Sequence, residues 1–137
     1  VVHTDQFTVV HSTLALPEEF PYIETLDDAL DCFRQMQKPI CFVAHTHVPV
    51  IFTQVGKRTS YELDLSQSVR LSGRTIVNIG SVGQPRDGDP RAAYCIYDSD
   101  ENLVTIRRVS YNIGTAADKI RAAGLPELLA MRLSLGR

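Results

Sequence analysis

The spacing of apolar residues predicts a chain made mainly of strands. Residues 40–44 form a continuous apolar run, which is typical of a strand buried on both faces of a sheet. Residues 61–65 alternate apolar and polar side chains and predict a half-buried strand. Further segments rich in apolar and β-branched residues also predict strands: 7–10, 50–55, 75–79, 92–97 and 103–109. The last two of these are separated by a polar segment that predicts a hairpin turn.

Helix signals occur in three places. Apolar residues recur at helical spacing over 26–36, and Thr25 with Asp28 three residues later resembles a capping box. Pro39 is expected to end this helix. A second helix is predicted over 115–124, capped by its first residue, Thr115.

Pro126 is expected at the first position of a third, short helix at the end of the chain. The resulting order is a strand, a helix, a series of strands and then two helices. This order indicates a mixed α/β sandwich, because a regular βαβ repeat would place a helix after nearly every strand.

The size, charge and cysteine content of the chain limit the classes of function that it can have. With 137 residues and a net charge of -2, the chain has the size of one domain and no electrostatic footprint for nucleic acid. Its basic C-terminal region is interpreted as the solvated face of helices. No apolar run is long enough to span a bilayer. The odd number of cysteines, at Cys32, Cys41 and Cys95, indicates a reducing, cytoplasmic compartment.

Three histidines stand at the ends of predicted strands, where open α/β sheets place their functional sites. His11 follows the first strand, and His45 and His47 follow the apolar run 40–44. In an extended segment, residues two apart point to the same side, so the last two imidazoles are expected to lie together. Neutral imidazole is a ligand for zinc, iron, nickel and manganese. Spacing alone leaves an ordinary structural role for all three equally open.

The glycine-rich loop 80–90 is the second candidate. Glycines after a strand allow backbone N–H groups to approach an anion, and Arg86 offers a guanidinium that can pair with a phosphate. The glycine spacing matches neither a phosphate-binding loop of the Walker type nor a dinucleotide fingerprint. A tight connection with Arg86 in a structural ion pair is the alternative.

Four segments, in order, resemble the calcineurin-like metallophosphoesterases, and in particular the small, single-domain bacterial phosphodiesterase group. Val10-His11-Ser12 resembles the fourth family motif, and Ala44-His45-Thr46-His47-Val48-Pro49 resembles the fifth. Asn78-Ile79-Gly80-Ser81-Val82-Gly83-Gln84-Pro85-Arg86 and the tail from Arg107 to Leu133 resemble later segments of the group. Ala44 and Ile79 depart from the usual Gly and Pro.

The resemblance implies an αββα sandwich with a mixed sheet, of which residues 1–137 form the C-terminal portion of one domain. It implies that His11 and His45 bind one divalent metal ion and His47 a second, and that Gly80, Ser81 and Arg86 contact substrate. Two cations would then share a hydroxide that attacks a phosphate ester. Manganese is the expected metal, with iron, nickel and zinc as alternatives. The substrate's identity and the oligomeric state are not indicated.

The three earlier motifs of the family, which supply a bridging carboxylate, an asparagine ligand and a catalytic histidine, are absent from the sequence. Because the chain starts at Val1 with strand-like sequence, they are expected upstream. The chain alone is therefore expected to be inactive, and the enzyme to be the protein completed by an upstream half.

Two other functions remain open from the sequence. One is a catalytically inactive scaffold or interaction module with the same fold. The other is a cupin-like metal protein, although a cupin would require a Glu three to four residues after the second histidine of the pair, where Val50 and Ile51 stand.

Overall fold

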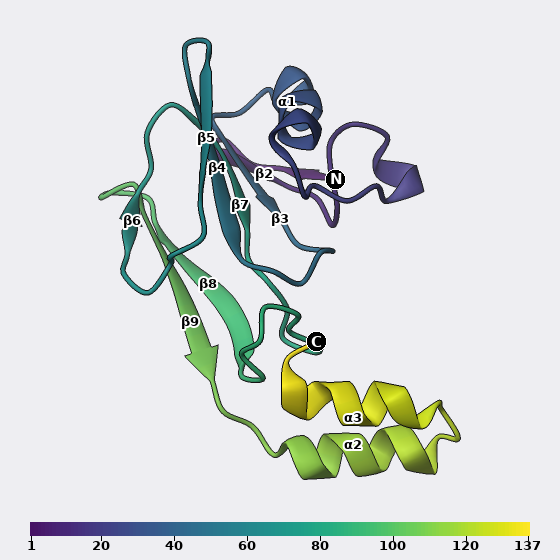
Figure 1. Cartoon of the computed structure of the whole chain (residues 1–137). Coiled ribbons are helices and arrows are strands. Elements are labelled where there is room, and N and C mark those ends of the chain that lie inside the picture. The colour runs from purple at the N-terminus through teal and green to yellow at the C-terminus, as the bar shows by residue number, and fades with distance from the viewer.

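The computed structural model describes all of residues 1–137 and contains two sheets and three helices (Figure 1). A six-stranded sheet has the order β1-β2-β3-β7-β4-β5, and a three-stranded sheet has the order β6-β9-β8. The strands are β1 (Val2–His3), β2 (Phe7–Val9), β3 (Ile40–Val43), β4 (Val50–Val55), β5 (Arg58–Glu62), β6 (Val69–Arg70), β7 (Arg74–Asn78), β8 (Ala92–Asp98) and β9 (Leu103–Val109). The helices are α1 (Leu26–Gln35), α2 (Ile113–Ala122) and α3 (Glu127–Leu135), with a short 3-10 turn at Pro17–Glu19.

Three neighbouring strands of the larger sheet, β2, β3 and β7, run parallel. Their registers align Val9 with Phe42 and Phe42 with Val77. Parallel strands end at the same edge of a sheet, so the loops after β2, β3 and β7 all begin there. β4 runs antiparallel to β7 and therefore starts at this edge.

Strand β3 is buried on both faces, as its continuous apolar run predicts. Cys41 and Val43 belong to a core shared with α1, whereas Ile40 and Phe42 belong to a core between the two sheets. Successive residues of a strand point to opposite faces, so all four must be apolar when both faces are covered. The layers are thus helix, large sheet and small sheet, and this confirms the predicted mixed α/β class.

Helix α1 starts as predicted and ends earlier. Thr25 accepts a hydrogen bond from the backbone N–H of Asp28, and the Asp28 carboxylate accepts one from the backbone N–H of Thr25 at 2.9 Å. The helix stops at Gln35, four residues before Pro39. The guanidinium of Arg74 on β7 donates to the carbonyls of Phe33 and Met36 and so satisfies the end of the helix.

The two C-terminal helices pack against each other and project from one end of the sandwich (Figure 1). Asn112 caps α2, three residues before the expected cap, and Pro126 is the residue before α3 and not its first residue. The chain end returns to the glycine-rich loop, where the N–H of Gly88 donates to the carbonyl of Gly136 at 3.0 Å. No helix is both long and apolar enough to cross a membrane.

The largest differences from the predicted elements lie at sheet edges. Strand β5 covers Arg58–Glu62, not 61–65, and it is almost wholly exposed because it is an edge strand of the large sheet. The two-residue strands β1 and β6 carry no sequence signal of their own. Their backbone pairing is supplied by β2 and β9.

The capping box gives a stability prediction. Replacing Asp28 with Ala removes the bond to the Thr25 backbone and should lower the free energy of unfolding by about 1 kcal/mol. Desolvation works against ionisation of Asp28, but the hydrogen bonds from Thr25 and Glu24 outweigh it and hold the pKa below its usual 3.8. The stabilisation is therefore present at neutral pH and is lost as the pH falls through that lowered pKa. Urea unfolding of the variant at pH 7 and pH 3 measures both effects.

Asp27→Ala is the matched control, since Asp27 lies in the same first turn but makes no cap hydrogen bond. A loss of stability equal in the two variants would show that only the helix dipole matters, and not the capping box.

Candidate functional site

The three candidate histidines lie in two loops at the edge where the parallel strands end. His11 follows β2, and His45 and His47 follow β3. The backbone N–H of Ala44 donates to the carbonyl of His11 at 3.0 Å, which ties the two loops together just beyond the paired strands. The sheet topology therefore brings side chains 34 residues apart in sequence to one place.

His11 and His45 are in direct contact. The Nε2 atom of His11 is 3.0 Å from the Nδ1 atom of His45, and the ring centroids are 4.9 Å apart. Tyr22 stacks on the His45 ring at 4.4 Å with an interplanar angle of 19°. Phe20 lies against both imidazoles, at 5.8 and 6.1 Å between centroids. The segment before α1 thus covers one side of the histidine pair with aromatic rings.

The segment 45–47 is not extended, so the prediction from residue alternation is wrong in its geometry. His45 and His47 both have left-handed backbone, with φ of 62° and 64°. The N–H of Thr46 donates to the carbonyl of Ala44 at 2.8 Å, which closes a three-residue turn around His45. Such conformations cost about 1–3 kcal/mol each in a residue with a side chain and persist only where neighbours hold them.

The amide of Asn78, at the end of β7, supplies much of that support. Its side chain is completely buried. The Nδ2 atom donates to the carbonyl of Ala44 at 2.7 Å and to the hydroxyl of Thr46 at 2.8 Å. The Oδ1 atom accepts from the N–H of Gly80 at 3.1 Å. One side chain therefore fixes the histidine loop and the glycine-rich loop relative to each other.

His47 is held by the glycine-rich loop. Its Nδ1 atom lies 2.7 Å from the carbonyl oxygen of Gln84, and because a carbonyl only accepts, Nδ1 must carry the proton. The Nε2 atom of neutral His47 is then left with its lone pair. The backbone N–H of Arg86 donates to the carbonyl of His47 at 3.1 Å, and its guanidinium is held by the Gln84 side chain at 3.1 Å. An imidazole pinned through one nitrogen to a carbonyl is the usual state of a metal-ligating histidine.

Burial and nearby positive charge favour the neutral form of His45 and His47. Burial lowers the pKa of His45, and the adjacent His11 and the Arg86 guanidinium lower it further. Burial also lowers the pKa of His47, with a further contribution from Arg86, although the bond to Gln84 works in the opposite direction. Neutral imidazole is the form that binds metal, so both shifts favour a ligand role.

The donor set fits a metal ion only in part. With metal–nitrogen bonds of about 2.1 Å, two histidines on a tetrahedral ion have nitrogens about 3.4 Å apart, close to the separation of His11 and His45. However, the chain contains no group of three or more His, Cys, Asp or Glu side chains arranged to hold a metal ion. His47 is thus not gathered with the other two, and no carboxylate joins the pair.

The loop residues expected to contact substrate have different local roles. The N–H of Gly80 is used by Asn78, and its φ of 76° and close approach to Pro49 leave no room for a Cβ atom. The hydroxyl of Ser81 accepts from the N–H of Gln84 at 3.0 Å. The Arg86 guanidinium uses Nε and Nη2 on the Gln84 side chain and keeps Nη1 unused as a donor.

Sequence reasoning assigned no role to Asn78, Tyr22 or Gln84. Asn78 had a usable signal, because a polar residue ending an apolar strand must find partners when it is buried. Tyr22 had none, since it lies in a proline-containing loop whose path follows only from packing. The contribution of Gln84 is a backbone carbonyl, which any residue provides.

Solved structures with the same fold are known. A metallophosphoesterase from Sphaerobacter thermophilus matches 98% of this chain with a TM-score of 0.86 and 39% sequence identity, and the match covers 57% of that protein. A hypothetical protein from Pyrococcus horikoshii, PH1004, matches 94% of the chain with a TM-score of 0.65 and covers 46% of that protein. At 18% identity, the second match concerns the fold alone.

Among curated proteins, an uncharacterized protein of Methanocaldococcus jannaschii, MJ0912, is 35% identical over 131 residues. The match takes in 93% of this chain and 50% of that protein, so the chain spans about half the length of the curated relative. No protein-family model matches the chain. The likeness in sequence and fold to the Sphaerobacter protein confirms the resemblance seen in the motifs and supports the chain's being part of a metallophosphoesterase.

Proposed function

We propose that the chain contributes the histidine ligands of a metal-dependent phosphoesterase that hydrolyses phosphate mono- or diesters when an upstream half completes the domain. The observation that carries the proposal is the convergence of His11 Nε2 and His45 Nδ1 at 3.0 Å, at the common edge of the parallel strands. A relative described as a metallophosphoesterase implies the use of divalent metal in general.

Each histidine would have a separate task. His11 Nε2 and His45 Nδ1 would bind one cation, and His47 would offer Nε2 to a second. The ions, when bound, would supply charge to stabilise the phosphoryl group and to activate water. Manganese is the metal we propose. The carboxylate and asparagine ligands would come from upstream, because this chain provides no third ligand beside the pair.

The surrounding residues would position this constellation. Arg86 has free donors and lies close enough to lower the pKa of both loop histidines, so it is the strongest candidate of the three loop residues for contact with a phosphoryl oxygen. Gly80 and Ser81 would act by shaping the loop that holds Arg86. All three cysteines are free, which supports the proposed cytoplasmic setting.

The first test is the loss of a ligand. In the protein completed by its upstream half, manganese should stimulate hydrolysis of bis-p-nitrophenyl phosphate, and His45→Ala should reduce kcat/KM by more than about 100-fold, because even residues that only support a metal ligand cost about 10- to 100-fold. The 137-residue chain alone should show no appreciable turnover.

His3→Ala is the control, since His3 lies on β1 and bonds only to Thr8. Unchanged turnover in His45→Ala would contradict the ligand assignment. A completed wild-type protein that binds no metal and hydrolyses no ester would favour the alternative function, an inactive scaffold.

A second test concerns Asn78. Replacing it with Ala leaves the Ala44 carbonyl, the Thr46 hydroxyl and the Gly80 N–H without their buried partner, so the free energy of unfolding should fall by about 2–3 kcal/mol. Denaturant unfolding of the 137-residue chain measures this loss. Asn112→Ala, which removes a single exposed cap bond, should cost about 1 kcal/mol. Equal losses of unfolding free energy in the two variants would show that the buried hydrogen bonds of Asn78 stabilise the fold no more than one exposed cap bond does.

A further inference from the structure

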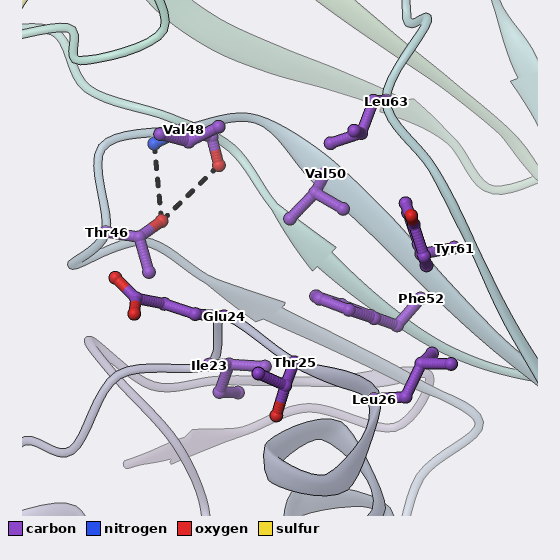
Figure 2. A pocket seen from close by; sticks show the side chains of 10 residues that line it. All are labelled: Ile23, Glu24, Thr25, Leu26, Thr46, Val48, Val50, Phe52, Tyr61 and Leu63. Carbon is purple, nitrogen blue, oxygen red and sulfur yellow. Dashed lines mark hydrogen bonds between the residues drawn. The ribbon is translucent and has the colours of Figure 1, made fainter.

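A cavity of about 520 Å³ lies beside the histidine loop, between the start of α1 and the β4–β5 hairpin (Figure 2). Its floor is made by Val50 and Phe52 of β4, which are buried, and Leu26 of α1. Tyr61, which is the cross-strand neighbour of Phe52 on β5, and Leu63 line the β5 side of the cavity and are more than half exposed, at 57% and 59%. A mostly apolar cavity of this size is typical of a small-molecule site.

The cavity adjoins the two segments that carry the histidine site. Thr46, which stands between His45 and His47 in the chain, lines it. Ile23 also lines it and directly follows Tyr22, the residue that stacks on His45. Both segments that shape the histidine pair therefore continue into the cavity. A ligand with one end at the histidines could place its other end there.

The chemistry of the cavity selects the kind of group that fits. No Lys, Arg or His lines it, and the Glu24 carboxylate stands at its mouth near Thr46 (Figure 2). The hydroxyl of Thr46 is already engaged by Asn78 and by the backbone of Val48. A phosphoryl group would meet no cation and one like charge, so it is excluded. An uncharged apolar group would replace water against Phe52, Val50 and Leu63.

We infer that this cavity binds the apolar organic group of the phosphate ester whose phosphoryl group lies at the histidines. The inference rests on the proposed function and adds a substrate class to it: esters with an aromatic or branched aliphatic group. The cavity is several times larger than one that holds a single benzene ring, about 150 Å³, so a group of two fused rings is an appropriate probe.

Binding is tested with 1-naphthol, which carries the apolar group without a phosphate. Calorimetric titration of the 137-residue chain should show binding, and Leu63→Asp should weaken it about tenfold by placing a carboxylate in the apolar wall. Val55→Asp is the matched control, because Val55 lies on the same hairpin, is 58% exposed and does not line the cavity. A second variant, Tyr61→Ser, should also weaken binding.

A wild-type chain that binds no naphthol would overturn the inference, as would binding that Leu63→Asp and Val55→Asp reduce equally. Thermal melts of the variants show whether each is folded.

Hydrolysis assays distinguish a failure of this inference from a failure of the proposed function. The completed enzyme should prefer 1-naphthyl phosphate to glycerol 2-phosphate in kcat/KM, and Leu63→Asp should remove that preference by lowering kcat/KM for the naphthyl ester far more than for the glycerol ester, whereas Val55→Asp should leave the preference in place. Equal hydrolysis of both esters by the wild type would overturn the cavity's role and leave the phosphoesterase function standing. No metal-dependent hydrolysis of either ester would overturn the proposed function itself.

Discussion

The buried amide of Asn78 is the constraint on which the histidine site depends. The loop 45–47 has two residues in left-handed backbone, a conformation that a histidine adopts only when its surroundings hold it there. Asn78 bonds to the carbonyl before this turn and to the hydroxyl inside it, and its remaining oxygen fixes Gly80. Because Asn78 ends β7, the register of the sheet sets the position of the imidazoles. The strain in the loop is thus balanced by contacts with the buried end of a central strand.

The parallel strands explain why a site forms at this edge. β2, β3 and β7 end together, so His11, the histidine loop and the glycine-rich loop meet without any long-range rearrangement. The segment before α1 then folds over them and adds Tyr22 against His45. The same edge is the start of β4, whose first residues line the apolar cavity. Histidine side chains, a guanidinium and an apolar wall therefore occupy adjacent positions along one sheet edge.

The sequence predicted the buried strands well, because their signal is local. The run 40–44 requires both faces of β3 to be covered, and the capping box at Thr25 identifies the start of α1 without reference to other parts of the chain. Features that depend on residues far away in the sequence were predicted less well. The early end of α1 is set by Arg74, and the exposed state of β5 follows from its place at the sheet edge. The left-handed turn at His45 was not predictable, since the Asn78 amide that holds it is 33 positions away in sequence.

In the proposed function, the two facing imidazoles of His11 and His45 bind one ion of a two-metal site. The most direct measurement is anomalous diffraction at the manganese edge from crystals of the completed protein grown with Mn²⁺. We expect two anomalous peaks, one within bonding distance of His11 Nε2 and His45 Nδ1 and the other within bonding distance of His47 Nε2. Manganese bound elsewhere, or no anomalous peak within bonding distance of these imidazoles, would contradict the assignment.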